Sequence, residues 1–281
     1  MIYSINHFFT KVFDVILSPI RNVNDFWPIL FLSILMSFFI LFLLKYISFP
    51  KKIKNEKEKI KANIFAIRIY KDFWKVILSS FFKSLFHTLK YFMFNLAPFL
   101  IIIPLLTPIF TQMESRYGVR PFKPSEVVVV KADFKKNIKD AEIYLMKNEH
   151  FNPVMPPVFM DYYSKIKGVR IHQIDWKIKI IKNGVSTIDI IAFGKQFSKR
   201  IVIGDHKISL SDTKYDISGW GHILYPSESL FGENSDIRSV SISYPGKLIT
   251  FMGIKMHWII WNLIIMVILI LVFKDRFGVE F

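Results

Sequence analysis

Lys45 is the one charged side chain in the long apolar segment 26–49. A cation within a membrane-spanning helix is costly, and such a residue is by default a candidate functional group. It could attract an acidic part of a bound chain. Lys45 also precedes Pro50 by only five residues, so its stem could instead carry the ammonium group to the lipid headgroups. The sequence leaves both interpretations open.

Ser33 and Ser37 share the first apolar segment with Lys45, and Asn95 lies in a second one, 91–112. We regard Lys45, Ser33, Ser37 and Asn95 as candidate residues of a hydrophilic groove. The alternative is that the three small polar side chains bond to their own helices or assist helix packing. Prolines remove backbone donors and bend a helix, which suits a helix that lines a cavity. The second segment carries three such helix-shaping residues, Pro98, Pro104 and Pro108.

Signatures of catalysis are missing from the sequence. It contains no Gly-x-Ser-x-Gly, no phosphate-binding loop, no His-Glu-x-x-His and no cysteine. The polar pairs Asp205-His206 and Gly221-His222 are read as turn or surface residues, and Trp220-Gly221 is read as a turn. Asp161-Tyr162-Tyr163 is read as a loop packed by its rings. We therefore expect no enzyme, with no catalytic residue, metal site or cofactor.

Three apolar segments, 26–49, 91–112 and 252–273, are each long enough to cross about 30 Å of hydrocarbon. Hydrophobic residues make up 52% of the chain, which is more than a soluble domain of this size carries. Met1 is followed by neither a basic region nor a small-residue cleavage site, so the first span is predicted to be retained. The prediction is a membrane protein with three transmembrane helices.

The charge distribution predicts how these spans are oriented. Residues 51–90 carry eleven Lys and Arg against three acidic residues, and the tail 274–281 begins with Lys274-Asp275-Arg276. Positive segments remain on the cytoplasmic side, so the N-terminus and residues 113–251 are expected outside the plasma (inner) membrane. Nucleic acid is a weaker explanation of the net charge of +16, unless the partner is ribosomal RNA.

The segments that flank the spans have distinct patterns. Residues 1–25 contain an apolar stripe at 5–17 that predicts an amphipathic helix in the membrane interface. Residues 50–90 predict a cytoplasmic hairpin of two amphipathic helices joined near Lys71-Asp72. Their apolar faces must pack on each other or on the membrane surface.

Residues 113–251 change to a pattern of period two, which predicts an extracytoplasmic, all-β, sandwich-like domain. Asn183-Gly184 predicts a hairpin turn, and residues 137–147 predict one short helix. The expected strands are 127–132, 173–182, 185–193, 201–203, 207–210 and 239–244.

Taken together, residues 26–108 resemble the YidC/Oxa/Alb insertase superfamily, in its compact three-span type. In that family a basic residue precedes a proline by five positions at the end of the first core helix, as Lys45 precedes Pro50 here. A basic pair of cytoplasmic helices follows, as in 51–90, and the next helix has the spacing of Pro98 and Pro104. This chain differs in having Lys where the family usually has Arg, and in placing its β-domain between the second and third spans. It also has Phe94-Asn95-Leu96-Ala97 in place of Gly-Gly-Cys, and Ile102 in place of Gln.

The resemblance implies a membrane protein insertase or membrane chaperone with a groove open to the cytoplasm. A client's polar tail would enter the groove near Lys45, and its apolar segment would move into lipid without a nucleotide. The implied partners are nascent membrane proteins, membrane lipids and, through the hairpin 51–90, the ribosome. The β-domain would bind a partner of unknown kind.

A non-insertase scaffold or assembly factor is the alternative function, with the β-domain as its working part. Removal of residues 126–250 would abolish a scaffold's activity and spare an insertase. A membrane enzyme and a transporter are less favoured, because catalytic motifs are missing and three spans form a poor translocation path.

Overall fold

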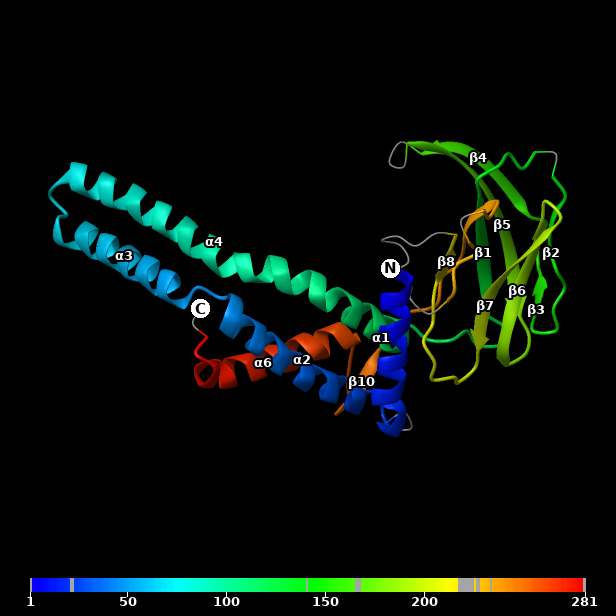
Figure 1. Cartoon of the computed structure of the whole chain (residues 1–281), viewed down its shortest axis with the longest axis horizontal. Coiled ribbons are helices and arrows are strands. Elements are labelled where there is room, and N and C mark those ends of the chain that lie inside the picture. The colour runs from blue at the N-terminus through cyan, green and yellow to red at the C-terminus, as the bar shows by residue number, and fades with distance from the viewer. Residues whose placement is uncertain are drawn as a thin grey trace. The chain divides into compact units, whose positions relative to one another are not determined.

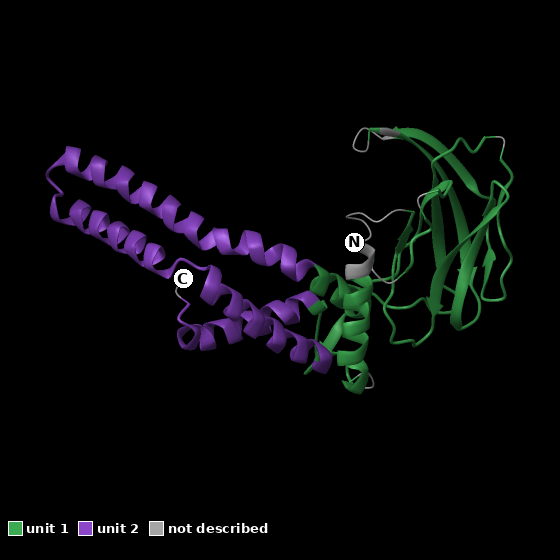
Figure 2. Ribbon diagram, in the orientation of Figure 1, with its two compact units in different colours: residues 1–26, 108–258 green, residues 27–107, 259–281 purple. Residues whose placement is uncertain are grey.

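The computed structural model describes residues 2–20, 23–139, 141–164, 168–216, 225, 228–232 and 234–279, and it divides into two compact units (Figure 2). Residues 27–107 and 259–281 form the helical unit. Residues 1–26 and 108–258 form the β-unit. The chain therefore combines long apolar helices with a separate region of antiparallel β-sheet, as the sequence predicts. Two expected turn pairs, Trp220-Gly221 and Gly221-His222, lie outside the described residues.

Three helices are long and apolar enough to cross a membrane: α2 (Phe26–Ile47), α4 (Trp74–Met113) with its continuation to Gly118, and α6 (Trp258–Phe277). They overlap the three predicted spans and follow the same order, with differences in their bounds. The remaining long helix of this unit is α3 (Pro50–Ile69), and Pro50 is its first residue. Proline suits the first turn of a helix because no helical acceptor awaits its missing N–H group.

Helices α2 and α6 pack side by side in the same direction (Figure 1). Near their N-terminal ends, Asn262 donates to Ser33, and further along Phe38 contacts Phe273 at 5.3 Å between ring centroids. Helix α4 runs in the opposite direction (Figure 1), and its Phe94 lies against Phe49, just beyond the end of α2. The end of α2, the start of α3 and the end of α6 lie close together, partway along α4, and the α3–α4 hairpin extends beyond them (Figure 1).

The predicted hairpin helix and the second span form one continuous helix, α4, of 40 residues. The composition changes near residue 90, where the predicted hairpin meets the predicted second span, but the helix continues through this boundary. Nothing in the backbone interrupts the helix there, because Lys90 is a good helix former between two apolar turns. The predicted join between the two hairpin helices is confirmed, since α3 ends at Ile69 and α4 begins at Trp74.

The third span begins later than predicted. Residues Met252 to Met256 belong to a small hairpin of β10 (Ile249–Phe251) and β11 (Ile254–Met256). Met252 and Gly253, with φ of 48° and 82°, form the turn that a two-residue hairpin requires. Helix α6 then includes the basic triplet that was expected to follow the span, since it ends only at Phe277.

The β-unit begins with α1 (Ile2–Leu17), the predicted amphipathic helix, followed by the 3-10 turn η1 (Ser18–Ile20). The end of α4 and its π-helical continuation η2 (Glu114–Gly118) hold α1 in place. Gln112 donates to the Thr10 hydroxyl at 2.9 Å, and Arg116 forms an ion pair with Asp14 at 2.7 Å.

Two antiparallel sheets enclose the core of the β-unit, as a sandwich-like fold requires (Figure 1). The larger sheet has the order β3-β5-β1-β9-β8, with β4 also paired to β5, and the smaller has the order β2-β6-β7. Alternate residues of β1, such as Val130 and Phe134, are fully buried, and Ile188 and Ile190 of β6 join the same core. The strands are β1 (Val127–Phe134), β2 (Ile143–Leu145), β3 (Phe151–Pro153), β4 (Val158–Ser164), β5 (Val169–Ile180), β6 (Gly184–Ala192), β7 (Lys195–Ile203), β8 (Thr213–Tyr215) and β9 (Ile237–Ile242).

Asn183-Gly184 does not form the predicted hairpin. It links β5 of the larger sheet to β6 of the smaller one. Strand β5 already pairs with β1 on one edge and with β3 and β4 on the other, so β6 has to pair elsewhere. The tight hairpin lies instead at Phe193-Gly194, where φ values of 53° and 72° join β6 to β7.

Three further local predictions were wrong. The described part of 137–147 contains no helix, and Ile143–Leu145 forms β2 against β6. Residues 207–210 are not a strand, because pairing with β9 begins only at Thr213. Asp161-Tyr162-Tyr163 is not a ring-packed loop but part of β4, paired along β5, with Tyr163 exposed. Asp205-His206 is an exposed bend, as expected.

Candidate functional site

Ser33 and Ser37 are buried in the contact between α2 and α6. Each hydroxyl donates to the carbonyl four residues earlier in its own helix, at 2.7 Å. The Asn262 amide of α6 donates to the Ser33 hydroxyl at 2.8 Å. Among the described residues, the Asn262 carbonyl oxygen is buried without a hydrogen-bond partner. These groups form a small polar cluster inside a helix contact, where hydrogen bonds between helices assist association.

Asn262 was missed by the sequence reasoning. A single asparagine within the apolar run 258–273 was the available signal, since polar residues inside a membrane helix normally find a partner. Its partner could not be named without the tertiary structure, because Ser33 is 229 residues away in the chain.

Lys45 is exposed in the last turn of α2, and the structure does not bring it to the buried serines. Eight residues separate it from Ser37, which corresponds to about 12 Å along a helix. Its exposed position is compatible both with a cation that attracts a client and with one that reaches the headgroups.

Asn95 lies beside the junction of α2 and α3. Its amide donates to the carbonyl of Tyr91 in the same helix at 2.7 Å. The neighbouring Phe94 contacts Phe49 at 6.3 Å between ring centroids, and the Lys52 ammonium lies near both rings. A positive charge over aromatic rings is favourable, so this junction gathers cationic and aromatic groups where α2 ends.

The three prolines leave α4 continuous and differ in environment. Pro98 is buried, Pro104 is exposed and Pro108 is half-buried. Each lacks an N–H group, so a backbone carbonyl one turn earlier loses its helical donor. Pro98 lies on the stripe of α4 that also buries Ile102 and Leu106. Its ring therefore contributes to helix packing.

A polar contact between α3 and α4 was not predicted. Glu56 is buried on α3, and its carboxylate lies 2.6 Å from Nδ1 of His87 on α4. Lys59 donates to the same carboxylate at 3.2 Å. The bond with His87 holds the pKa of Glu56 below its ordinary value, against the opposing effect of burial. The two hairpin helices are thus joined through a carboxylate.

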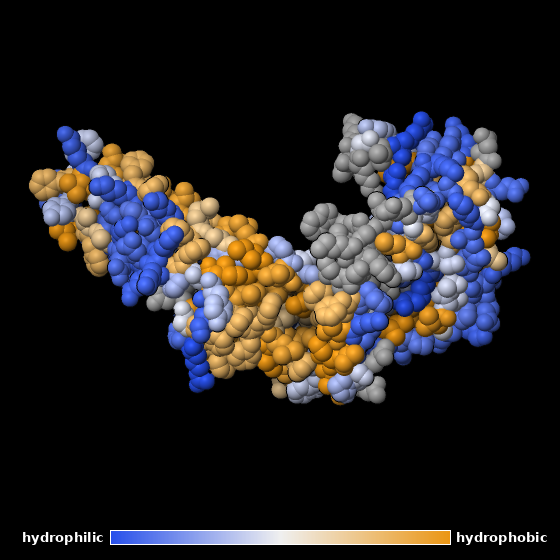
Figure 3. Space-filling view, in the orientation of Figure 1, coloured by the Kyte–Doolittle hydropathy of each residue, from blue (hydrophilic) through white to orange (hydrophobic). Residues whose placement is uncertain are grey.

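The apolar faces of the two hairpin helices were predicted to pack on each other or on the membrane surface, and most of their large apolar side chains are exposed in the structure. Hydrophobic side chains dominate the visible surface of the long apolar helices, whereas hydrophilic ones gather on α3 (Figure 3). We call the exposed set on the α3–α4 hairpin the hairpin apolar surface; it comprises Ile64, Phe65, Ile69, Tyr70, Phe73, Trp74, Val76, Leu78, Phe81, Phe82, Leu85, Phe86 and Leu89.

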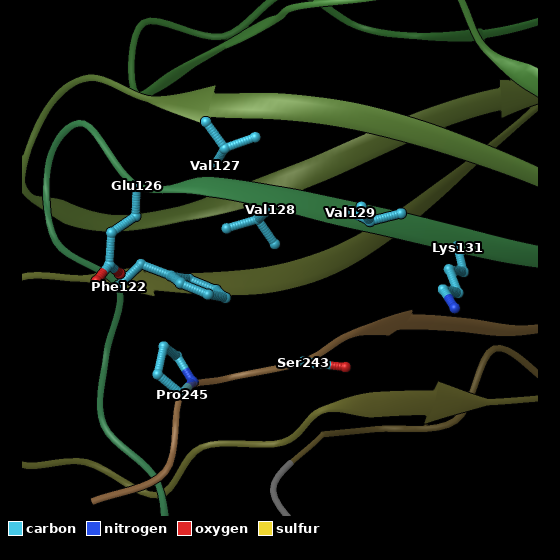
Figure 4. Close-up of a pocket in the computed structure, with 8 residues that line it drawn as sticks. All are labelled: Phe122, Glu126, Val127, Val128, Val129, Lys131, Ser243 and Pro245. Carbon is cyan, nitrogen blue, oxygen red and sulfur yellow. The ribbon is translucent and has the colours of Figure 1, made fainter.

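The β-unit has a pocket of about 520 Å³ beside β1 (Figure 4). It opens where β9 ends, since β1 pairs with β9 only from Val130 onward. Val127 and Val129 are exposed on one side, and Glu126 at the rim accepts hydrogen bonds from Arg120. The lining is formed by Phe122, Glu126, Val127, Val128, Val129, Lys131, Ser243 and Pro245.

A buried ion pair lies elsewhere in the β-unit. The Lys199 ammonium is fully buried and donates to Glu228 at 2.5 Å and to the carbonyl of Ser211 at 2.7 Å. Burial lowers the pKa of Lys199, and the attraction of Glu228 opposes that shift. Burial also raises the pKa of nearby Asp212. Each group has a partner, so we assign the pair a structural role.

Among the described residues, no group of three or more His, Asp or Glu side chains could hold a metal ion. No protein-family model matches this chain, and comparison with curated proteins and solved structures found no match.

Proposed function

We propose that this chain is a membrane protein insertase or membrane chaperone that receives apolar client segments on its α3–α4 hairpin. The observation that carries the proposal is the length and exposure of α4. Its 40 residues extend about 60 Å, twice the thickness of the hydrocarbon layer. If residues 91–112 span the bilayer, the preceding 17 residues project beyond it.

The projecting part of α4 remains apolar. Phe82 and Leu85 are more than half exposed, and the rest of the hairpin apolar surface adjoins them. A contiguous apolar patch outside lipid normally marks a binding site. A helix that serves only as an anchor has no use for such a patch, whereas a site that receives hydrophobic segments requires one.

The same helix offers a route toward lipid. The exposed apolar side chains continue from Leu89 through Phe92 and Leu96 to Leu100 and Ile103. A client segment that binds to the hairpin could move along this face without crossing a polar barrier. Lys45 and Lys52, at the junction of α2 and α3, would attract an acidic tail of the client during that movement.

Site-specific photocrosslinking tests this proposal. A photoreactive residue placed at Phe82 or Leu85 should crosslink to ribosome-bound nascent membrane proteins only when the client contains an apolar segment. The matched control is Lys182, an exposed position on the β-unit that is predicted to face the opposite side of the membrane. Crosslinks only to lipid would refute the proposal and assign the hairpin apolar surface to the bilayer interface.

The pocket beside β1 favours the second candidate, a scaffold whose β-unit binds a partner. Its open strand edge and exposed valines suit a short extended segment of another protein. If the scaffold is correct, replacing Val127 and Val129 with aspartate should abolish activity, whereas the insertase should tolerate both changes.

A further inference from the structure

A pocket rich in lysine lies between α3 and the end of α6, within the helical unit. Its volume is about 350 Å³, and an adjoining pocket of about 270 Å³ extends it toward Pro50. We call the larger cavity the lysine pocket. Its lining consists of Ile53, Lys54, Lys57, Glu58, Lys61, Lys274, Asp275 and Val279.

The local fold of both helices builds this pocket. Lys54, Lys57 and Lys61 are spaced three and four residues apart, so they lie on one face of α3. Helix α6 ends at Phe277, and the next residue, Gly278, has a φ of 68° that turns the chain back. The amide of Val279 donates to the carbonyl of Lys274 at 3.0 Å, which completes a Schellman-type cap.

That cap directs the chain onto α3. Val279 is 2% exposed and Ile53 is 1% exposed, and both line the floor of the lysine pocket. These two buried apolar side chains form the bottom of the cavity, and the lysines form its sides. The lysines therefore surround one defined cavity and are not isolated surface charges. The floor also limits the depth to which a polar ligand can enter.

The pocket carries positive charge. Four lysines and two carboxylates leave a net charge of +2. Within the part of the chain that the structure describes, no ion pair joins Lys54, Lys61 or Lys274 to a carboxylate. The C-terminal dipole of α6 opposes an anion, but the cap already engages its last carbonyls. The balance favours an anionic ligand.

The position of the pocket indicates which kind of anion it binds. Pro50 lies three residues beyond the end of α2, and Gly278 is the first residue beyond α6, so the two cavities adjoin the ends of two apolar helices. If these helices span a bilayer, the lysines lie at the level of the lipid phosphates. Basic pockets at this level bind anionic headgroups.

We propose that the lysine pocket binds the phosphate group of an anionic glycerophospholipid. The lipid chains would extend along α6, where Leu271 and Val272 are exposed. This inference rests on the membrane placement of α2 and α6, and it is independent of any client. Failure of the client-crosslinking test would leave it standing.

The test measures lipid binding to the full-length protein in detergent by native mass spectrometry. Phosphatidylglycerol is titrated against phosphatidylcholine. A variant with Lys54, Lys61 and Lys274 changed to glutamine should bind phosphatidylglycerol about tenfold or more weakly, with little change for phosphatidylcholine. The corresponding arginine variant should retain binding, because it keeps the charge.

The matched control changes three exposed lysines of the same hairpin, Lys71, Lys75 and Lys83, to glutamine and should bind as the unchanged protein does. Equal losses in pocket and control variants would overturn the proposal, since overall charge would then determine binding. If inorganic phosphate alone displaces phosphatidylglycerol from the protein, the pocket is assigned to a free anion. Loss of ribosome binding in the pocket variant, with lipid binding intact, would assign it to RNA.

Discussion

Most large apolar side chains of α4 are exposed, whereas alternate ones along β1 and β5 lie inside the β-unit. In the most apolar window of α4 only 17% of the residues are buried, while Val130, Phe134, Ile174 and Ile178 are fully buried. Burial of apolar area is the main force that stabilises a domain in water. The β-unit therefore has a stabilising core of its own, and the helices depend on surroundings that accept apolar surface.

The largest expected difference in stability is between substitutions of a buried apolar side chain in the β-unit and of an exposed one on α4. Trp176→Ala in the core should destabilise the β-unit by about 3–5 kcal/mol, because it leaves a cavity. Leu85→Ala on α4 should leave unfolding nearly unchanged. Hydrogen exchange of the β1 and α4 amides measures both. A large effect of Leu85→Ala would mean that this surface is covered in the folded protein.

The charged groups of the β-unit offer the next contrast. Lys199→Met leaves the Glu228 carboxylate buried without its cation and should cost about 3–5 kcal/mol. The exposed pair of Lys182 and Glu149 should tolerate Lys182→Met without measurable change. Chemical denaturation of both variants, monitored by the circular dichroism signal of the β-sheet, measures the two free energies of unfolding. Similar stabilities would show that Lys199 is hydrated.

Polar substitutions on the hairpin should affect binding and spare folding. Changing both Phe82 and Leu85 to serine should weaken photocrosslinking of apolar clients by about tenfold, since two half-buried contacts are lost. The double change of Lys71 and Lys75 to serine is the control. If both variants crosslink equally, the hairpin apolar surface does not receive clients.

Acid should separate the two hairpin helices. Folding lowers the pKa of Glu56 below its ordinary value of 4.5. The ionised carboxylate therefore stabilises the hairpin fully above pH 4.5, and this stabilisation is lost as the pH falls below that value. Spin labels on α3 and α4 should move apart on acidification. Glu56→Gln should remove the pH dependence, and an unchanged transition in that variant would assign it to another group.

The smallest effect is expected at Lys45. Lys45→Ala should weaken the handling of acidic-tailed clients, and Lys45→Arg should be tolerated, because only the charge is needed. The comparison is made by insertion assays with acidic and neutral tails. Equal activity of all three proteins would indicate that Lys45 serves only to reach the headgroups.

Regular periodicity made large parts of the fold predictable. The helical stripes of α1 and α3, the alternation in β1 and the apolar runs of the spans all follow from local side-chain patterns. Boundaries were less predictable. The composition changes at residue 90, yet the backbone of α4 continues, because a helix ends through its hydrogen bonds and not through its polarity.

The residues of the candidate site were likewise predictable from the sequence only in part. The sequence by itself determined that Lys45, Ser33, Ser37 and Asn95 are the unusual groups of the apolar segments, because polar atoms are costly there. Only the tertiary structure decided that the serines meet Asn262. It likewise decided that Glu56 meets His87, and that Asn183-Gly184 changes sheets. Such pairings join residues distant in the chain, and they are selected by which edges and faces remain free once neighbouring elements have packed.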